Sequence, residues 1–591
     1  MKELEYPFDA GYLIMKKKSL KRQLLASDTK FIEKKIAILG GSTTHDIAVM
    51  LELFLLNVGI KCEIYESEYG KYWEDVMFDN PGLDDFSPDI IYIHTTNRNI
   101  AFPNVKMTAK EVDALLESEY KRFASMWEKI EEKYHCPVIQ NNFEFPLLRL
   151  LGNSDCYNTS GHVNFINLLN AKFSEYAREH KDFYIEDIQY LSASYGLDKW
   201  SDPLYWYKYK YALSMDAIPT LSYSVSSVIK SIYGKNKKAI ALDLDNTLWG
   251  GVVGDDGAEN LEIGQETSAG EAYSEFQQYI KDQKDIGVIL TVNSKNDHEN
   301  AIAGLSHPDT VLTADDFVVV KANWETKSKN LADTASELNL LPESFVFVDD
   351  NPAEREIVRA QIGGVAVPEL GSIESFAAMI DHAGYFEVTN LSADDANRNE
   401  MYRANAQRAQ LLSSFSDYGQ YLDSLEMTAE IGSFTPVLFD RLSQLSNKSN
   451  QFNLTTKRYS RSEIEEIAND RGYIDLYGKL IDKFGDNGVV SVVIGHVSED
   501  VLDIDLWIMS CRVLKRDMEY AMMDSLVKRA KEAGVHTIKG HYYPTAKNNM
   551  VRDFYELMGF TKVSEDDKGN TEWLLDITKD YSNKNTHIKL L

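Results

Sequence analysis

Short apolar runs that alternate with amphipathic stretches are the feature that most limits how this chain can fold. Residues 36–39 read as a buried strand, residues 46–58 as an apolar helix, and residues 63–65 and 89–93 as further strands. Strands that alternate with helices favour a parallel, doubly wound sheet. We therefore expect an α/β domain over residues 1–232.

The alternation restarts after a polar linker, residues 233–238. Apolar runs at 239–242, 288–292 and 345–348 are separated by stretches with helical periodicity. This pattern predicts a second α/β domain, of Rossmann-like character, over residues 233–385.

A polar, helix-like connector, residues 386–424, precedes the last part of the chain. Residues 425–591 mix strands, such as 489–494 and 504–509, with a helix over 518–526. This mixture predicts an α+β domain, so the fold class is α/β with three domains.

Composition limits the partners. The 591 residues include 62 Lys plus Arg and 92 Asp plus Glu, a formal net charge of −30. This charge argues against a broad nucleic-acid or membrane-binding face. No run approaches the ~20 apolar residues of a membrane helix. The four cysteines show no disulfide or zinc spacing, and no secretory signal begins the sequence, so we expect a cytoplasmic protein.

Two carboxylates, Asp243 and Asp245, directly follow the strand 239–242. At the carboxyl edge of a parallel sheet, one can attack phosphorus or carbon while the other handles a proton. A single such pair is more often a solvated turn. Three further strand-end or helix-start signals, in chain order, favour a site instead.

Those further signals suit phosphate chemistry. Asp349 and Asp350 follow a later strand and offer the oxygen ligands that Mg²⁺ prefers. Asn293 and Ser294 end the strand that lies in sequence between the two aspartate-bearing strands, and they offer hydrogen bonds to phosphate. Lys327 offers a positive charge.

This constellation resembles the haloacid dehalogenase (HAD) superfamily of phosphatases and phosphotransferases over about 130 residues. The resemblance implies Asp243 as nucleophile, Asp245 as acid/base, and Thr247, Ser294 and Lys327 as groups that steady the phosphate. The metal ligands it implies are Asp243, Asp245, Asp349 and Asp350, for Mg²⁺. About twenty residues separate Trp249 from the next helix, too few for a large cap domain.

Longer strings narrow the resemblance. Residues 241–254, 348–355 and 450–456 together resemble the FkbH-like proteins. That family takes the glyceryl group of 1,3-bisphosphoglycerate, releases phosphate, and loads the glyceryl group as a thioester on an acyl carrier protein. The alternative is a HAD phosphatase of a phosphorylated small molecule or sugar, in a surface-polysaccharide or secondary-metabolite pathway, without acyl transfer.

Acyl transfer requires a thiol. In the family a cysteine commonly precedes Ser-Lys-Asn-Asp, but Asn293 stands there in this chain. Cys511 is the other candidate, because Arg512 beside it could favour the thiolate; a small buried residue is the alternative reading. The substrate-binding residues that we predict are Asn293, Asn296, Asn450, Asn453, Thr455 and Arg512. Turn roles for Asn450, Asn453 and Thr455 remain an equal alternative.

The last domain resembles the GNAT acyltransferase fold through residues 554–560 and a strand–loop–helix at 508–522. Arg512 matches the pyrophosphate loop of that fold, but Lys515 and Asp517 replace its glycines. A carboxylate there would repel coenzyme A, so a carrier-bound phosphopantetheine arm is the better expectation.

The first domain resembles the SGNH hydrolases, with Ser42 as the nucleophile and Asn97 as an oxyanion donor. Tyr205 stands where the catalytic histidine should be, so we expect this domain to be non-catalytic. An acidic carrier would also need a local basic patch on this acidic chain. The candidate patches are Lys208 with Lys210, Lys457 with Arg458, and Arg512 with Lys515 and Arg516; solvated charges on separate faces are an equal alternative.

Overall fold

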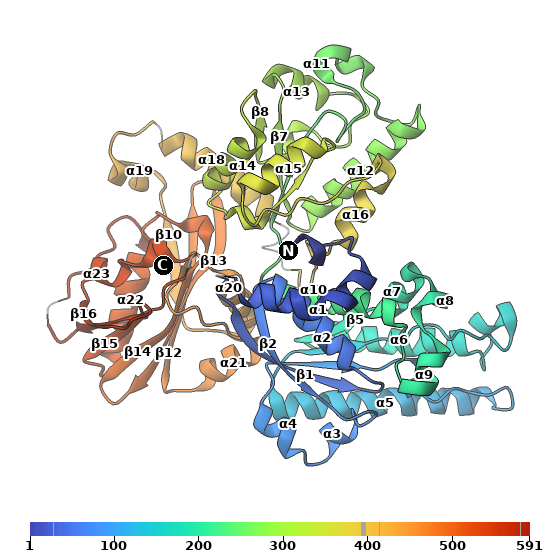
Figure 1. Cartoon of the computed structure of the whole chain (residues 1–591). Coiled ribbons are helices and arrows are strands. Elements are labelled where there is room, and N and C mark those ends of the chain that lie inside the picture. Colours follow the sequence, from blue (N-terminus) through green and yellow to red (C-terminus); the bar gives the residue numbers. More distant parts are fainter. Residues whose placement is uncertain (28, 392–396, 413, 546, 580) are drawn as a thin grey trace. The chain divides into compact units, whose positions relative to one another are not determined.

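A computed structural model describes residues 1–27, 29–391, 397–412, 414–545, 547–579 and 581–591 (Figure 1). The chain divides into two compact units, residues 1–232 with 460–463, and residues 233–459 with 464–591. Part of the predicted connector, residues 392–396, lies outside the described residues. Among the helices of the described chain, none combines the length and apolar character that a membrane span requires.

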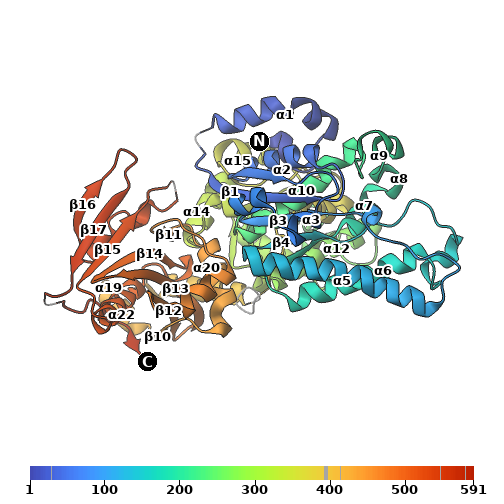
Figure 2. The same ribbon diagram turned by 90° about the horizontal axis from the view of Figure 1, so that it is seen from below.

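Five parallel strands form the sheet of the first unit, in the order β2-β1-β3-β4-β5. Their bounds are Ile60–Glu66 for β2, Ile32–Gly40 for β1, Ile90–His94 for β3, Val138–Asn141 for β4 and Phe183–Glu186 for β5. Ala37 and Ile91 point to the core formed with α5 (Ala109–Tyr134) and α6 (His162–Glu179). Helices α2 (His45–Asn57) and α10 (Ile218–Ile232), packed together, cover the other face (Figure 2). The predicted parallel α/β arrangement is confirmed.

Four parallel strands form the central sheet, in the order β8-β7-β6-β9. Their bounds are Val319–Ala322 for β8, Ile289–Ser294 for β7, Ala239–Leu242 for β6 and Phe345–Val348 for β9. Leu242 pairs with Val348, so the residues that follow β6 and β9 emerge side by side. Between β6 and α12 (Ser268–Asp285) the chain forms only short elements, including α11 (Val253–Asp256), which leaves no room there for a cap domain.

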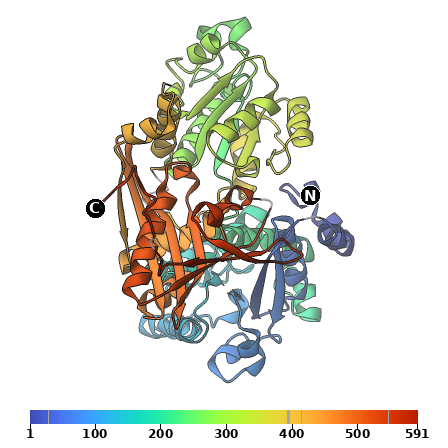
Figure 3. The same ribbon diagram turned by 90° about the vertical axis from the view of Figure 1, so that its left-hand side faces the viewer.

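A mixed sheet closes the chain, in the order β16-β17-β15-β14-β13-β12-β10-β18, and Figure 3 shows it in orange and red. The strand bounds are Thr428–Gly432 for β10, Tyr473–Asp482 for β12, Gly485–Ser498 for β13, Val501–Met509 for β14, Thr537–Tyr542 for β15, Thr561–Glu565 for β16, Thr571–Asp576 for β17 and Lys589–Leu590 for β18. After β14 the chain passes through a short loop into α22 (Met518–Glu532), the strand–loop–helix order that the sequence predicts.

Strands β14 and β15 pair in parallel only near their starts, at Val501 to Asp503. Beyond that point β11 (Phe452–Asn453) pairs with the end of β14 instead. Leu454 continues this insertion, because its N–H donates to Trp507 O over 3.1 Å and its carbonyl accepts from Tyr543 N over 2.9 Å. The opening between the two strands is thus filled by the chain's own backbone.

Candidate active site

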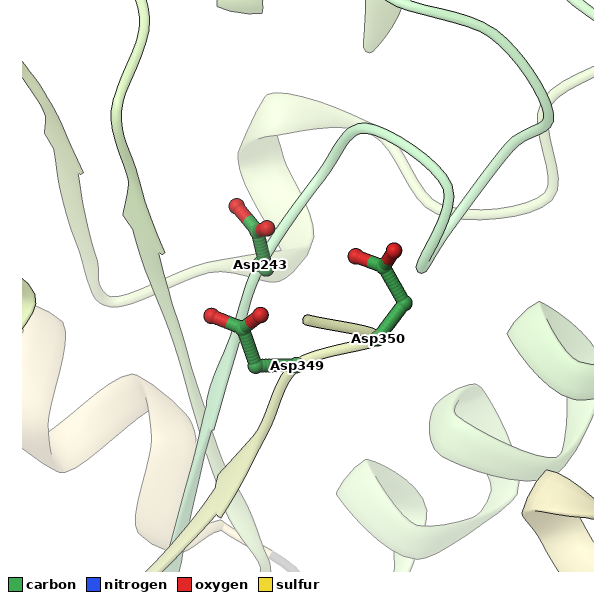
Figure 4. Close-up of side chains that lie close together, drawn as sticks. All are labelled: Asp243, Asp349 and Asp350. Atoms are coloured by element: carbon green, nitrogen blue, oxygen red, sulfur yellow. The ribbon is translucent and has the colours of Figure 1, made fainter. Parts of the chain in front are cut away.

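Three carboxylates converge at the carboxyl edge of the central sheet (Figure 4). Asp243 follows β6, and Asp349 and Asp350 follow β9; one oxygen of each lies within 4.8 Å of the others. Oδ1 of Asp243 is buried and has no hydrogen-bond partner among the described residues. An all-oxygen set with an unpartnered buried oxygen fits a hard cation such as Mg²⁺.

Lys327 neutralises part of this charge. It begins α14 (Lys327–Glu337), which Thr326 caps by accepting a hydrogen bond from Lys329 N. Its Nζ lies 2.6 Å from Asp243 Oδ2 and 2.5 Å from Asp349 Oδ2. Burial disfavours the ammonium, but the two carboxylates outweigh burial and raise the pKa of Lys327. Burial, together with the charge of Asp243, raises the pKa of Asp349 to about 6.

Asp245 is not one of the three carboxylates that lie within 4.8 Å of one another, and its predicted role as a metal ligand stays a prediction. Its Oδ1 accepts hydrogen bonds from Trp249 Nε1 over 2.9 Å and from Val253 N over 3.1 Å. Its Oδ2 accepts from Asn296 Nδ2 over 2.9 Å. Burial raises the pKa of Asp245, which suits a group that delivers and removes a proton.

Two further residues hold the loop after β9 in place. Thr247 Oγ1 donates to Asp350 Oδ1 over 3.3 Å and accepts from Asp350 N over 3.1 Å. Arg355 donates from Nη1 to the carbonyls of Asp349, over 2.7 Å, and Asp350, over 2.8 Å. The sequence pattern predicts no role for Arg355, although this residue lies in the segment 348–355 that resembles the FkbH-like proteins. A buried arginine needs such acceptors.

The residues at the end of β7 are drawn into the same network. Asn293 Nδ2 donates to Lys327 O over 2.8 Å, so this amide braces the start of α14. Asn296 is bonded to Asp245, and Ser294 is 1% exposed. For Asn293 and Asn296 the structure shows positioning contacts; their predicted contact with substrate stays a prediction.

Cys511 contacts the central domain, and its predicted role as the acyl-carrying thiol stays a prediction. It packs against the core of the central domain, and its Sγ lies 3.5 Å from the Tyr402 hydroxyl. Lys238, whose charge interacts with Cys511, precedes β6, whereas Asp243 follows that strand. Five residues of extended chain, at about 3.3 Å per residue, separate these two positions by roughly 16 Å.

The predicted substrate contacts of the last domain instead bond to the chain itself. Asn450 Oδ1 accepts from Arg458, and Asn453 Oδ1 accepts from Thr456 N over 2.8 Å. Thr455 Oγ1 donates to Asp505 O over 2.7 Å. The turn interpretation is therefore favoured for these side chains. Arg512 is similarly engaged, since its Nε donates to Ser510 Oγ over 3.2 Å.

In the first unit, the predicted hydrolase residues do not assemble into a triad. Ser42 Oγ is buried and has no hydrogen-bond partner in the described chain. Asn97 Nδ2 donates to the carbonyls of Glu144 and Phe145, over 3.4 and 3.3 Å. The ring of Tyr205 packs 5.9 Å from that of Tyr209.

The fold and the carboxylate cluster define an enzyme with a HAD-type phosphatase domain. The chain is similar to the crystal structure of the N-terminal part of the protein BF1531 from Bacteroides fragilis, described as containing a phosphatase domain complexed with Mg. The two are 30% identical, with a TM-score of 0.59, over 63% of this chain and 99% of that chain. Residues 35–230 match the family described as FkbH, N-terminal domain. The chain therefore belongs to the FkbH-like family.

The similarity to two further solved structures is weaker. The ribosomal-protein-S18-alanine N-acetyltransferase from Escherichia coli is 14% identical, with a TM-score of 0.21, over 27% of this chain and 100% of that chain. Ard1 from Thermoplasma volcanium is 16% identical, with a TM-score of 0.21, over 25% and 97% of the two chains. The comparison with curated proteins found no match.

Proposed function

We propose that this protein is a Mg²⁺-dependent phosphatase that works together with glyceryl transfer to an acyl carrier protein. One observation carries the phosphatase part: Asp243, Asp349 and Lys327 meet at the carboxyl edge of the central sheet, with Asp245 held beside them. Asp243, Asp349 and Asp350 would hold Mg²⁺, which, when bound, would screen the negative charge of a phosphate.

The chain's own groups account for the bonds that change. A carboxylate oxygen of Asp243 attacks phosphorus, the bond from phosphorus to the leaving oxygen breaks, and Asp245 gives that oxygen its proton. Water then attacks the aspartyl-phosphate, Asp245 takes up the proton of the water, and phosphate leaves with Asp243 restored. Lys327 keeps a positive charge beside the phosphoryl oxygens throughout.

For glyceryl transfer, the thiol of the carrier's phosphopantetheine arm attacks the acyl carbon of 1,3-bisphosphoglycerate. The acyl phosphate leaves as phosphate, a thioester forms, and the phosphatase site hydrolyses the remaining phosphomonoester. The carrier's own thiol is the acceptor in this proposal, because an amide stands at position 293 and Cys511 lies near the opposite edge of the sheet.

The second candidate is a phosphatase of a phosphorylated small molecule or sugar without acyl transfer. The position of Cys511 favours it, because this thiol packs on the core of the central domain and interacts with Lys238 at the other end of β6 from Asp243.

Intact-mass analysis separates the two candidates. The protein is incubated with 1,3-bisphosphoglycerate, Mg²⁺ and a candidate carrier protein. A glyceryl increment on the carrier, which becomes a phosphoglyceryl increment with Asp243→Asn, supports transfer. Phosphate release with every candidate carrier unmodified supports the plain phosphatase.

A further inference from the structure

Basic side chains gather at the amino edge of the central sheet, the edge opposite Asp243. Lys235 and Lys238 come from the segment that leads into β6. Lys547 comes from the segment after β15, and Arg458 from the turn after β11. We call these four side chains the sheet-edge cation cluster.

Hydrogen bonds, an ion pair and close packing fix the position of each segment. Lys547 forms an ion pair with Glu343, whose backbone carbonyl accepts a hydrogen bond from Lys237 Nζ over 2.8 Å. Gly234 packs so closely on the helix before β11 that a Cβ there would lie 2.6 Å from Asn447 O. That same carbonyl accepts from Arg458 Nη1 over 2.6 Å. The two basic segments and the linker are thus held against one another.

Positive charge exceeds negative charge in this cluster. Lys235 faces Lys547 and Arg458, while Lys238 faces Lys547 and Arg398. Glu343 is the carboxylate that faces both lysines, and it already pairs with Lys547. Burial first, and then these like charges, lower the pKa of Lys235 to about 8. The side chains of Lys235 and Lys238 have no hydrogen bond or ion pair with any other described residue.

This local excess of positive charge lies in a chain with a net charge of −30. Like charges that are partly removed from water repel, and a bound anion would relieve that repulsion. The lysine ammonium groups at this site suit a phosphate, which offers several acceptor oxygens at once. The Arg458 guanidinium, which donates to the carbonyls of Ser446, Asn447 and Ser449, contributes positive charge. The thiol of Cys511, which faces Lys238, lies at the margin of the cluster.

We infer that the sheet-edge cation cluster binds the phosphate group of a ligand, at a site distinct from the carboxylate cluster at Asp243. The phosphodiester of a phosphopantetheine arm and free inorganic phosphate share this chemistry. The inference rests on the proposed function only in the choice of phosphopantetheine as a probe.

The test is calorimetric titration of the full chain, in EDTA, with 4′-phosphopantetheine, pantetheine and inorganic phosphate. We expect phosphopantetheine to bind at least tenfold more tightly than pantetheine. Lys547→Glu should weaken this binding at least tenfold. Lys528→Glu, on the exposed side of α22, makes the same change in charge and should leave it unchanged. Equal binding of phosphopantetheine and pantetheine, or by wild type and Lys547→Glu, overturns the inference.

Inorganic phosphate identifies the source of the anion. Tighter binding of phosphopantetheine than of phosphate indicates a carrier arm, whereas equal affinities indicate free phosphate; both outcomes require that Lys547→Glu weakens binding. Hydrolysis of p-nitrophenyl phosphate with Mg²⁺ should stay within twofold in Lys547→Glu. If that variant misfolds, Lys235→Gln decides in its place. If the wild-type protein does not hydrolyse p-nitrophenyl phosphate but still binds phosphate, the result contradicts the proposed function and leaves the phosphate site standing.

Discussion

The indole N–H of Trp249 donates a hydrogen bond to Oδ1 of Asp245 over 2.9 Å. The Trp249 ring is buried and packs against Gly304, where an added Cβ would lie 2.8 Å from it. Asn296 holds the other oxygen of Asp245. The carboxylate that must move a proton is therefore held on both sides before any substrate binds.

Replacing Trp249 with Phe should lower kcat roughly tenfold, with a smaller change in KM, because Asp245 loses one positioning bond. Loss of a hydrogen bond to the carboxylate also raises its pKa, so the limb of the pH–rate profile governed by Asp245 should shift to higher pH. Trp324→Phe is the control, since it removes an indole bond to Asp297 on the surface. An unshifted profile in Trp249→Phe contradicts this role.

Lys327→Met should destabilise the metal-free protein by about 3–5 kcal/mol, since it leaves two buried carboxylates without their cation. Saturating Mg²⁺ should restore part of the loss. Urea unfolding in EDTA and in Mg²⁺ measures both quantities. Lys329→Met, whose exposed ion pair with Glu325 contributes little, should stay within about 0.5 kcal/mol of wild type. A loss of equal size with and without Mg²⁺ would refute the proposal that Mg²⁺ binds the same carboxylates as Lys327.

His94 makes the first unit sensitive to acid. Burial lowers its pKa from 6.5 to about 4. Between these values the unfolded chain binds more protons, so this group's contribution to stability falls as pH falls. His94→Gln should therefore lose about 2 kcal/mol less stability than wild type between pH 7 and pH 5. Burial raises the pKa of Glu144 to about 7, which acts in the opposite direction but in both proteins alike. Parallel stability–pH curves would be inconsistent with a neutral, buried His94.

Gly540→Ala tests the packing of the last domain. A Cβ at this position of β15 would lie 2.2 Å from the ring of Tyr555, which is fully buried. We expect a loss of at least about 3 kcal/mol in the free energy of unfolding, or no folded protein. Gly363→Ala meets no atom within 4 Å and should change stability by less than about 0.5 kcal/mol. A mild effect of Gly540→Ala would show that the Tyr555 ring can move aside.

The sequence predicts the central site well, because its signals are local. Asp243, Asp349 and Asp350 each follow a short apolar run, and parallel strands bring such ends to one edge of a sheet. Lys327 could be placed for a similar reason, since it begins a helix beside that edge. Asp245 could not be resolved further, because its bonds to Trp249 and Asn296 depend on side-chain orientation rather than on spacing.

The side-chain contacts of the last domain could not be predicted from residue spacing. From the sequence, Asn453 and Thr455 could be substrate contacts or turn residues. In the structure, Asn453 Oδ1 accepts from Thr456 N and Thr455 Oγ1 donates to Asp505 O of β14. The surroundings of Cys511 cannot be predicted from spacing, because its neighbours Tyr402 and Lys238 are distant in sequence. Such contacts depend on how the domains pack. The hydrophobic periodicity of the sequence predicts helices and strands but not this packing.

Phosphate release tests the central claim most directly. Wild type and Asp243→Asn are compared with p-nitrophenyl phosphate and Mg²⁺, with circular dichroism as the folding control. We predict that Asp243→Asn lowers the rate by roughly 10³-fold or more, as expected when a nucleophile is removed. Retention of near-wild-type phosphate release by a folded Asp243→Asn protein would contradict the assignment of Asp243 as the nucleophile.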